Sequence, residues 1–159
     1  MPLPEFNIST SLNLEGVADE KIALFRDAVV VRVNELDAEL QARLQEAYSG
    51  GVVKQRTGKA ARSVEAIPAT IEGSMVVGRV TAGGGTAPYV DLLETGTAPH
   101  VITPKNASAL AFNWNGQDVF FKRVNHPGTQ AYHIVENTFE AMEDEIIASL
   151  QAIPEEVFG

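Results

Sequence analysis

Six residues of this chain have side chains that could hold a metal ion: His100, His126, His133, Asp91, Glu94 and Glu136. Imidazole nitrogens and carboxylate oxygens are common ligands of zinc and related metals. None of these residues stands in a diagnostic spacing such as H-E-x-x-H, and His126 directly precedes a proline in an expected turn. We therefore interpret the histidines as structural or surface residues. A small α+β enzyme or a metal-binding domain that uses His100 and His126 is the alternative.

Catalysis by paired carboxylates or by a nucleophile has little support. Asp91 and Glu94 lie three residues apart on one face of an expected helix, where such a pair is usually a solvated face. The chain has no cysteine, which excludes thiolate catalysis, disulfides and cysteine-based zinc sites. The G-x-S-x-G elbow of serine hydrolases is absent. We predict that the protein is not an enzyme and has no catalytic residue.

Phosphate and cofactor motifs fail on their spacing. Six residues separate Gly51 from Gly58 where a P-loop has four, and Ala60 stands where that motif needs Ser or Thr for magnesium. The triple glycine at residues 83–85 lacks the further glycine of a dinucleotide-binding fingerprint. The sequence therefore predicts no cofactor and no metal.

Size and composition are typical of one globular domain. The chain has 159 residues, of which 45% are hydrophobic, and its mean hydropathy is −0.02. We place a single domain at residues 1–159, with a core at about residues 6–150 and a C-terminal tail at residues 151–159. No apolar run approaches the roughly 20 residues that a membrane span needs. The N-terminal M-P-L-P-E-F-N has no basic region before an apolar core, so we expect no signal peptide and synthesis in the cytoplasm.

The charge distribution is acidic with one basic cluster. A net charge of −9 disfavours broad contact with nucleic acid, because neutralising phosphates needs clustered lysine and arginine. We consider three classes of function, which are a structural protein, a small enzyme and a nucleic-acid-binding module. The acidic charge makes the nucleic-acid-binding module the least favoured of the three. The basic cluster consists of Lys54, Arg56, Lys59 and Arg62. Such charge runs are usually solvated loops, and the sharper hypothesis is a contact with an acidic face of a neighbouring protein.

Two amphipathic helices are expected. Over residues 18–48 the apolar positions recur every three or four residues, at Ile22, Phe25, Val29, Val33, Leu36, Leu40, Leu44 and Ala47. About 30 residues at ~1.5 Å each give roughly 45 Å, so part of this helix should protrude from the core or meet a partner. The second helix spans residues 130–150, has an acidic outer face, and is expected to end at Ile153 and Pro154. Its apolar stripe is Val135, Phe139, Met142, Ile146 and Leu150.

Short strands are expected before and after the first helix. Residues 6–14 alternate between apolar and polar side chains, which is the period of a half-buried strand. Residues 65–71 and 75–82 form two further strands joined by a turn. Pro68 places the first of these towards an edge of the sheet, because proline cannot donate to a strand ladder.

Two short helices are expected from their capping residues. Thr57 can cap a helix over residues 58–64, and Thr86 can cap another that begins after it. Gly96 can adopt the left-handed conformation that ends the second of these. Residues 97–103 are then expected to be extended.

The clearest tertiary signal is a β-hairpin around Asn115-Gly116, the pair that best suits a two-residue turn. Its strands are residues 109–114 and 117–122. The turn sets the register and gives one almost wholly apolar face, with Trp114 opposite Gln117, Phe112 opposite Val119, and Leu110 opposite Phe121. Together the elements predict an α+β fold, in which a long N-terminal helix and a C-terminal helix pack on an antiparallel β-sheet of about five strands.

Four segments occur in an order that identifies a resemblance. T-G-K-A-A-R-S-V contains Thr57, Gly58, Arg62 and Ser63. Y-V-D-L-L-E-T-G-T-A-P-H-V-I-T-P contains Tyr89, Glu94, Gly96, Thr97, Pro99, His100 and Pro104. K-N-A-S-A-L-A-F-N-W-N-G follows directly, and V-N-H-P-G-T then contains His126, Pro127 and Gly128. Over residues 6–150 the chain resembles the minor tail component or tail-completion family of long-tailed phages, the tenth gene product of the lambdoid type.

The resemblance implies a structural virion protein of the phage neck or tail, with a tail-completion or tail-terminator role. It implies a ring of identical subunits at the head-to-tail junction, with a hexamer favoured and a dodecamer as the alternative. The expected partners are the connector or stopper and the tail-tube or terminator proteins, with no membrane and with DNA only passing through the channel. The protein would be made in the cytoplasm of a bacterial host and end in the virion, and the motif residues would serve assembly.

Overall fold

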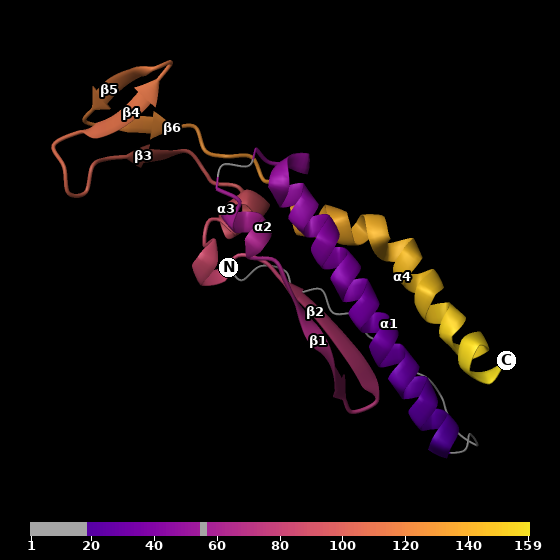
Figure 1. Cartoon of the computed structure of the whole chain (residues 1–159). Helices are drawn as coiled ribbons and strands as arrows, with labels where there is room; N and C mark the ends of the chain where they lie inside the picture. The colour runs from indigo at the N-terminus through magenta and orange to yellow at the C-terminus, as the bar shows by residue number, and fades with distance from the viewer. Residues whose placement is uncertain (1–18, 55–56) are drawn as a thin grey trace.

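Two long helices lie side by side and form the body of the molecule. The computed structural model describes residues 19–54 and 57–159. Helix α1 spans Asp19–Glu46 and helix α4 spans Ile134–Phe158, and Figure 1 shows them packed against each other. The strand expected at residues 6–14 lies outside the described residues. In the part that the structure describes, no helix is both long and apolar enough to cross a membrane.

The expected apolar stripe of α1 is confirmed as the centre of the core. Its buried members are Phe25, Val29, Val33, Leu36, Leu40 and Leu44. Helix α4 contacts one side of α1, and a hairpin of strands β1 (Glu65–Glu72) and β2 (Met75–Thr81) contacts another. The buried positions of α1 run from Phe25 to Leu44, so most of the helix lies against these elements.

Arginine side chains of α1 fix its register against α4. The Arg32 guanidinium donates to the Ser149 carbonyl oxygen at 2.8 Å and to the Glu156 carboxylate at 2.8 Å. One helical turn from the end of α1, Arg43 pairs with Glu145 at 2.5 Å. Partly exposed ion pairs contribute little free energy of folding, so their main effect is to select one alignment of two helices.

One carboxylate is buried between α1 and the β1–β2 hairpin. Asp37 is 2% exposed, and its Oδ2 accepts a hydrogen bond from the Arg79 amide at 3.1 Å. Gly78 lies so close that a Cβ at its position would stand 2.4 Å from the same oxygen. Burial raises the pKa of Asp37 to about 6, and the hydrogen bond from Arg79 opposes part of that rise.

The prediction of one sheet of about five strands is wrong. The described residues form three separate two-stranded antiparallel sheets, which pair β1 with β2, β3 with β6, and β4 with β5. The additional strands are β3 (His100–Ile102), β4 (Leu110–Trp114), β5 (Gln117–Phe121) and β6 (Val124–His126). The β1–β2 hairpin packs on α1, whereas the other two sheets lie together beyond one end of the helices (Figure 1). Turn residues predict each hairpin locally, but they do not specify whether neighbouring hairpins share a sheet.

Both β-hairpins have the expected strands. Strands β4 and β5 have the predicted register, from Trp114 opposite Gln117 to Leu110 opposite Phe121. Asn115 and Gly116 have φ of 53° and 85°, which is the geometry that the tight turn requires. In the other hairpin, the register shifts between Ile67 and Thr70, around Pro68, because proline donates no hydrogen bond there.

The expected helix caps are wrong. Helix α2 (Lys59–Arg62) begins after Gly58, which has a φ of 67° and stands at the capping position in place of Thr57. Thr86 lies in a short 3-10 turn, η2 (Gly84–Thr86), and α3 (Val90–Thr95) begins after Tyr89 with no side-chain cap. Both starts are set by contacts with the body, because Ala60 and Val90 are buried there.

The predicted end of the C-terminal helix is also wrong. Helix α4 continues through Pro154 to Phe158, so residues 151–158 are helical and not a tail. Proline removes one backbone donor, yet Ile153 is buried and the Phe158 ring stacks on Phe25 at 5.7 Å between centroids. These contacts hold the last turns on the core. At the other end, His133 has a left-handed φ of 49°, which delays the start of α4 from residue 130 to residue 134.

Candidate functional site

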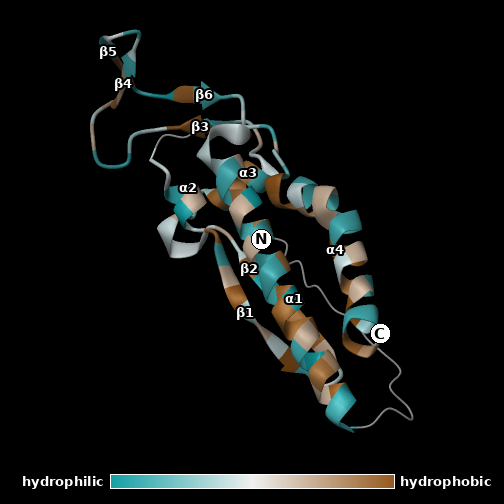
Figure 2. Ribbon diagram, turned by 45° about the vertical axis from the view of Figure 1, so that its right-hand side comes forward, coloured by the Kyte–Doolittle hydropathy of each residue, from teal (hydrophilic) through white to brown (hydrophobic). Residues whose placement is uncertain are grey.

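Residues 98–130 form an arm that leaves the body between α3 and α4. The arm contains β3, β4, β5 and β6, and no residue in it is buried. Figure 1 shows it projecting away from the two long helices, and Figure 2 shows hydrophobic stretches on its strands. The arm therefore exposes large apolar residues and has no buried core of its own, a feature typical of contact surfaces.

The root of the arm brings together two segments of the resemblance. Thr97, from E-T-G-T-A-P-H, and Thr129, from H-P-G-T, form an antiparallel bridge. The Thr97 amide donates to the Thr129 carbonyl oxygen at 2.8 Å, and the Thr129 amide donates back at 3.0 Å. The Thr97 hydroxyl oxygen lies 2.9 Å from the same Thr129 amide and accepts a hydrogen bond from it. These hydrogen bonds join two residues that are 32 positions apart in the sequence, and so close the base of the arm.

The glycines of both segments are required by the closeness of this crossing. A Cβ at Gly96 would stand 2.5 Å from the Thr129 carbonyl oxygen, and one at Gly128 would stand 2.2 Å from the Thr97 carbonyl oxygen. Both glycines also have positive φ, of 71° and 91°. Any side chain at either position would push the two segments apart. The left-handed conformation expected for Gly96 at the end of α3 is wrong, because its positive φ is combined with an extended ψ of −176°. The close contact between the two segments explains why glycine stands at both positions.

His100 and His126 face each other three residues beyond the Thr97–Thr129 bridge. They are paired across β3 and β6, and their rings stack with centroids 5.0 Å apart. The Nδ1 of His126 accepts a hydrogen bond from the Gly128 amide at 3.1 Å, and the Nδ1 of His100 lies 2.9 Å from the Ala98 carbonyl oxygen, to which it donates. Each Nδ1 therefore forms a hydrogen bond with the backbone two residues away, near the root of the arm, and helps to hold the local turn.

Glu94 fastens the root of the arm to the body. It is 3% exposed, and its carboxylate accepts hydrogen bonds from the Tyr48 hydroxyl at 2.5 Å and from the Val135 amide at 3.1 Å. The second contact satisfies a free amide in the first turn of α4, where a negative charge is favourable. His133, at the capping position, provides no side-chain cap itself. Burial and, after it, the Glu94 carboxylate raise the pKa of Tyr48 far above its usual range.

The expectation that Glu94 belongs to a solvated face is therefore wrong. Asp91 is half-buried one turn earlier, whereas Glu94 points into the junction of α3, α4 and the π-helical turn η1 (Ala47–Gly51). Its two contacts occupy both carboxylate oxygens. His133 pairs instead with Glu136 at 3.2 Å. Across residues 19–54 and 57–159 no three histidine or acidic residues are grouped as a metal would require.

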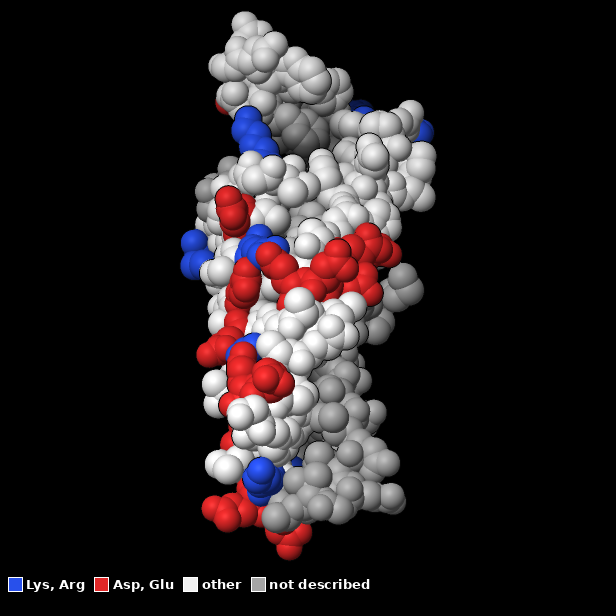
Figure 3. Space-filling view, turned by 90° about the vertical axis from the view of Figure 1, so that its right-hand side faces the viewer, with Lys and Arg blue, Asp and Glu red and all other residues white. Residues whose placement is uncertain are grey.

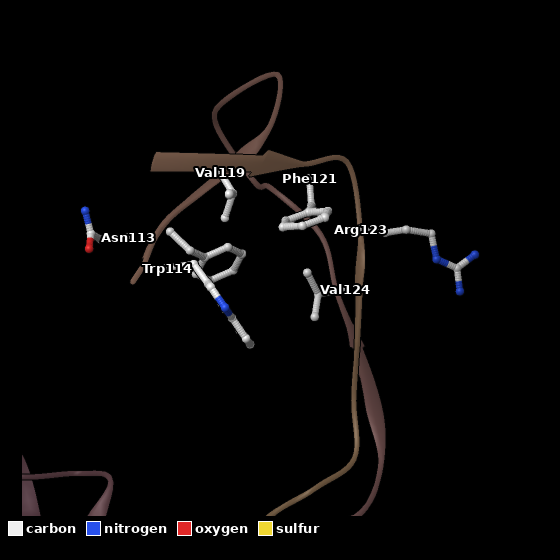
Figure 4. Close-up of a pocket in the computed structure, with 7 residues that line it drawn as sticks. Asn113, Trp114, Val119, Phe121, Arg123 and Val124 are labelled. Carbon is white, nitrogen blue, oxygen red and sulfur yellow. The ribbon is translucent and has the colours of Figure 1, made fainter. Parts of the chain in front are cut away.

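A pocket lies on the outer part of the arm. Its volume is about 630 Å³, and its lining residues are Phe112, Asn113, Trp114, Val119, Phe121, Arg123 and Val124. Figure 4 shows Trp114, Val119, Phe121 and Val124 directed towards one another, whereas the Arg123 side chain points away. The Trp114 side chain is 69% exposed. The apolar hairpin face predicted from the sequence thus exists, but it lines an open pocket and does not pack on the core.

The first segment of the resemblance lies on the body beside the arm. Ser63 donates to the Ala60 carbonyl oxygen at 2.6 Å and accepts from the Gly83 amide at 2.9 Å, which ties α2 to the triple-glycine loop. Arg62 donates to the Thr57 carbonyl oxygen at 3.0 Å. In the basic cluster, Lys54, Lys59 and Arg62 are exposed, whereas Arg56 lies outside the described residues. Of the remaining motif residues, Tyr89, Pro99 and Pro127 are exposed and Pro104 is half-buried.

Acidic side chains are concentrated on the side of the molecule formed by α4. Helix α4 carries Glu136, Glu140, Glu143, Asp144, Glu145, Glu155 and Glu156 and has no lysine or arginine. Figure 3 shows this side, where red acidic side chains predominate. The arm has the opposite balance, since Lys105, Lys122 and Arg123 accompany a single acid, Asp118.

Sequence reasoning missed two features of the site. Tyr48 was not expected as the partner of Glu94, although its position four residues after Leu44 continues the buried stripe of α1 and could have indicated burial. The exposure of Trp114 and Phe121 was also missed, because the alternation of a hairpin shows which side chains share a face but not what that face meets.

Comparison with known proteins adds no identification: no protein family, no curated protein and no solved structure matches this chain.

Proposed function

We propose that this chain is a structural subunit of a phage neck or tail, with a tail-completion or tail-terminator role. In this proposal identical subunits form a ring at the head-to-tail junction during virion assembly, with six copies favoured over twelve. The ring contacts the connector or stopper on one side and the tail-tube or terminator protein on the other. DNA passes through the channel and is not held by the chain.

The arm is the observation that carries the proposal. Residues 98–130 contain no buried side chain, so their aromatic surface is left for another molecule to cover. The segments that carry the resemblance are the same segments that build the arm and its root, through the Thr97–Thr129 bridge and the His100–His126 pair. Their glycines and Glu94 are used for positioning the arm, which is what an assembly protein needs from them.

The electrostatics also support a channel or ring protein over one that binds nucleic acid. A net charge of −9, with the acids gathered on α4, repels a phosphate backbone. The basic side chains of Lys59 and Arg62 stand on α2, near the arm, where they can meet the acidic side of a neighbouring subunit. A ring of identical subunits requires such pairs of different and complementary surfaces.

Binding to isolated phage parts tests the proposal. The purified full chain is mixed with isolated tail tubes or with purified connectors, and each mixture is centrifuged so that only the large particles sediment. We expect the chain to sediment with at least one of them at a fixed stoichiometry. Sedimentation with neither of them would contradict the proposal. Binding to free DNA would favour a nucleic-acid-binding module instead.

A further inference from the structure

The outer pocket of the arm needs a covering molecule. Trp114 is 69% exposed, Phe121 is 47% exposed and Phe112 is 40% exposed, although all three are on one face of the hairpin. A single protein does not usually leave a contiguous aromatic face in water unless that face is a contact site. The arm also matches a contact in size, because a stable interface involves about 20–30 residues on each side.

The charges beside the pocket narrow the class of partner. Arg123 is on the rim of the pocket, Lys122 is its neighbour in sequence, and Lys105 lies in the same arm. This surface favours an acidic partner. The chain itself has such a surface on α4, which carries acidic residues and no basic ones.

A second hollow stands next to that acidic surface. It has a volume of about 340 Å³ and lies between the end of α1, the π-helical turn and the first turns of α4. Apolar side chains open onto it, since Val52 is 53% exposed and Tyr132 is 40% exposed. Glu46, Ala141 and Arg43 are further parts of its wall, and the Arg43 guanidinium is paired with the α4 residue Glu145. An aromatic side chain can enter a hollow of this size, with its basic neighbours directed towards the acids of α4.

We propose that the aromatic face of the arm docks on a second copy of this chain, at the hollow formed by Val52, Tyr132 and Ala141. The two surfaces are different parts of the molecule, so the contact is head-to-tail and leaves one arm and one hollow free at the ends of any open assembly. Repetition of this contact closes a ring or continues as a filament. This inference rests on the proposed function and specifies the contact that holds its ring together.

The first test uses Trp114, the only tryptophan of the chain, as its reporter. The emission of a tryptophan moves to shorter wavelength when its ring leaves water. We expect the emission of the full chain to shift in this way, and quenching by acrylamide to fall, as the protein concentration rises through its association range. Sedimentation velocity measured on the same samples should show association over the same concentrations.

Paired variants then locate the two surfaces. Phe121→Ser removes an aromatic ring from the pocket face, and Phe120→Ser is its matched control, because Phe120 is 68% exposed on the opposite face of the same strand. On the body, Ala141→Arg fills the hollow with a bulky cation, and Ala148→Arg places the same side chain at another exposed position of α4. We expect the first member of each pair to weaken association about tenfold or more, and each control to change it little.

Mixing the two disabling variants distinguishes a head-to-tail contact from a symmetric one. Phe121→Ser retains its hollow and Ala141→Arg retains its arm, so one intact contact can still form between them. At a concentration where the unmodified chain associates and each variant alone is a monomer, we expect the mixture to form a one-to-one dimer that grows no further. A mixture that stays monomeric would overturn the head-to-tail arrangement.

Failure of this inference is distinguishable from failure of the proposed function. If Phe121→Ser and Ala141→Arg both associate like the unmodified chain, the inferred contact is wrong, whatever the chain binds in a virion. If Trp114 emission shifts only when tail tubes or connectors are added, the occupant of the pocket is another phage protein and the inference is overturned, although the proposed function stands. A shift caused by phospholipid vesicles alone would overturn both.

Discussion

Substituting Asp37 by asparagine should stabilise the protein at neutral pH. The Asp37 carboxylate is 2% exposed, and one amide hydrogen bond, from Arg79, compensates only part of the cost of burying its charge. Its pKa in the folded protein is about 6, against 3.8 for the same group in an unfolded chain. An asparagine side chain at this position would carry no charge and could still accept the hydrogen bond from Arg79.

The sign and size of the effect follow from proton linkage. Between pH 3.8 and about 6 the folded protein holds a proton on Asp37 that the unfolded chain has released. Its contribution to the free energy of unfolding therefore falls as pH rises through this window, by about 3 kcal/mol in all, at ~1.4 kcal/mol per pKa unit. The amide group of asparagine adds donors that need partners, which costs about 1 kcal/mol or more. We expect Asp37→Asn to gain about 1–2 kcal/mol above pH 7 and to lose that advantage near pH 4.

Urea unfolding of the unmodified chain and of Asp37→Asn, at steps of pH from 4 to 8, measures this difference. Asp27→Asn makes the same change of net charge at an exposed position of the same helix, and so isolates the contribution of burial. We expect the difference between Asp37→Asn and the unmodified chain to rise through pH 4–6 and then to level off. Parallel unfolding profiles for the two proteins over the whole range would refute the reasoning.

Three further perturbations test how the arm is anchored and how α4 ends. Tyr48→Phe removes the hydroxyl that donates to the buried Glu94, so the free energy of unfolding in urea should fall by about 1–3 kcal/mol; no loss would contradict the role given to this hydrogen bond. Gly128→Ala sets a Cβ against the Thr97 carbonyl oxygen, and hydrogen exchange of the Thr97 amide should accelerate while amides of α1 keep their protection; exchange unchanged at both sites would count against the crossing. Pro154→Ala restores a backbone donor within α4, and the melting temperature should rise by a few degrees, whereas a lower melting temperature would show that the proline ring itself stabilises the last turns.

Local sequence patterns predicted the elements that depend on neighbouring residues. The stripe of α1 and the register around Asn115-Gly116 both arise from periodicity and turn geometry, and both are confirmed. The prediction of where α4 ends was wrong because that end depends on residues distant in the sequence. Proline was expected to end the helix, but the burial of Ile153 and the stacking of Phe158 on Phe25 involve the other end of the chain. Tertiary contacts of this kind override a local preference.

The site depended on relations that single segments do not contain. Glu94 and Tyr48 are 46 positions apart, so their hydrogen bond leaves no spacing to recognise. The two glycine-containing segments were noted for their order, but their direct contact through Gly96 and Gly128 follows only from the crossing of the chain. The division of the six described strands into three sheets likewise depends on where each hairpin packs. Alternation and turn residues are the same in either arrangement.

Electron microscopy of the full chain bound to tail tubes and connectors is the most direct test of the assembly role. The account predicts a closed ring of identical subunits at the junction, seen end-on as a symmetric annulus, with the arm of each subunit on the body of the next. The Phe121→Ser variant should leave the junction without that ring, and Phe120→Ser should retain it. A chain that remains a monodisperse monomer in the presence of both partners, with no added density at the junction, would contradict the account.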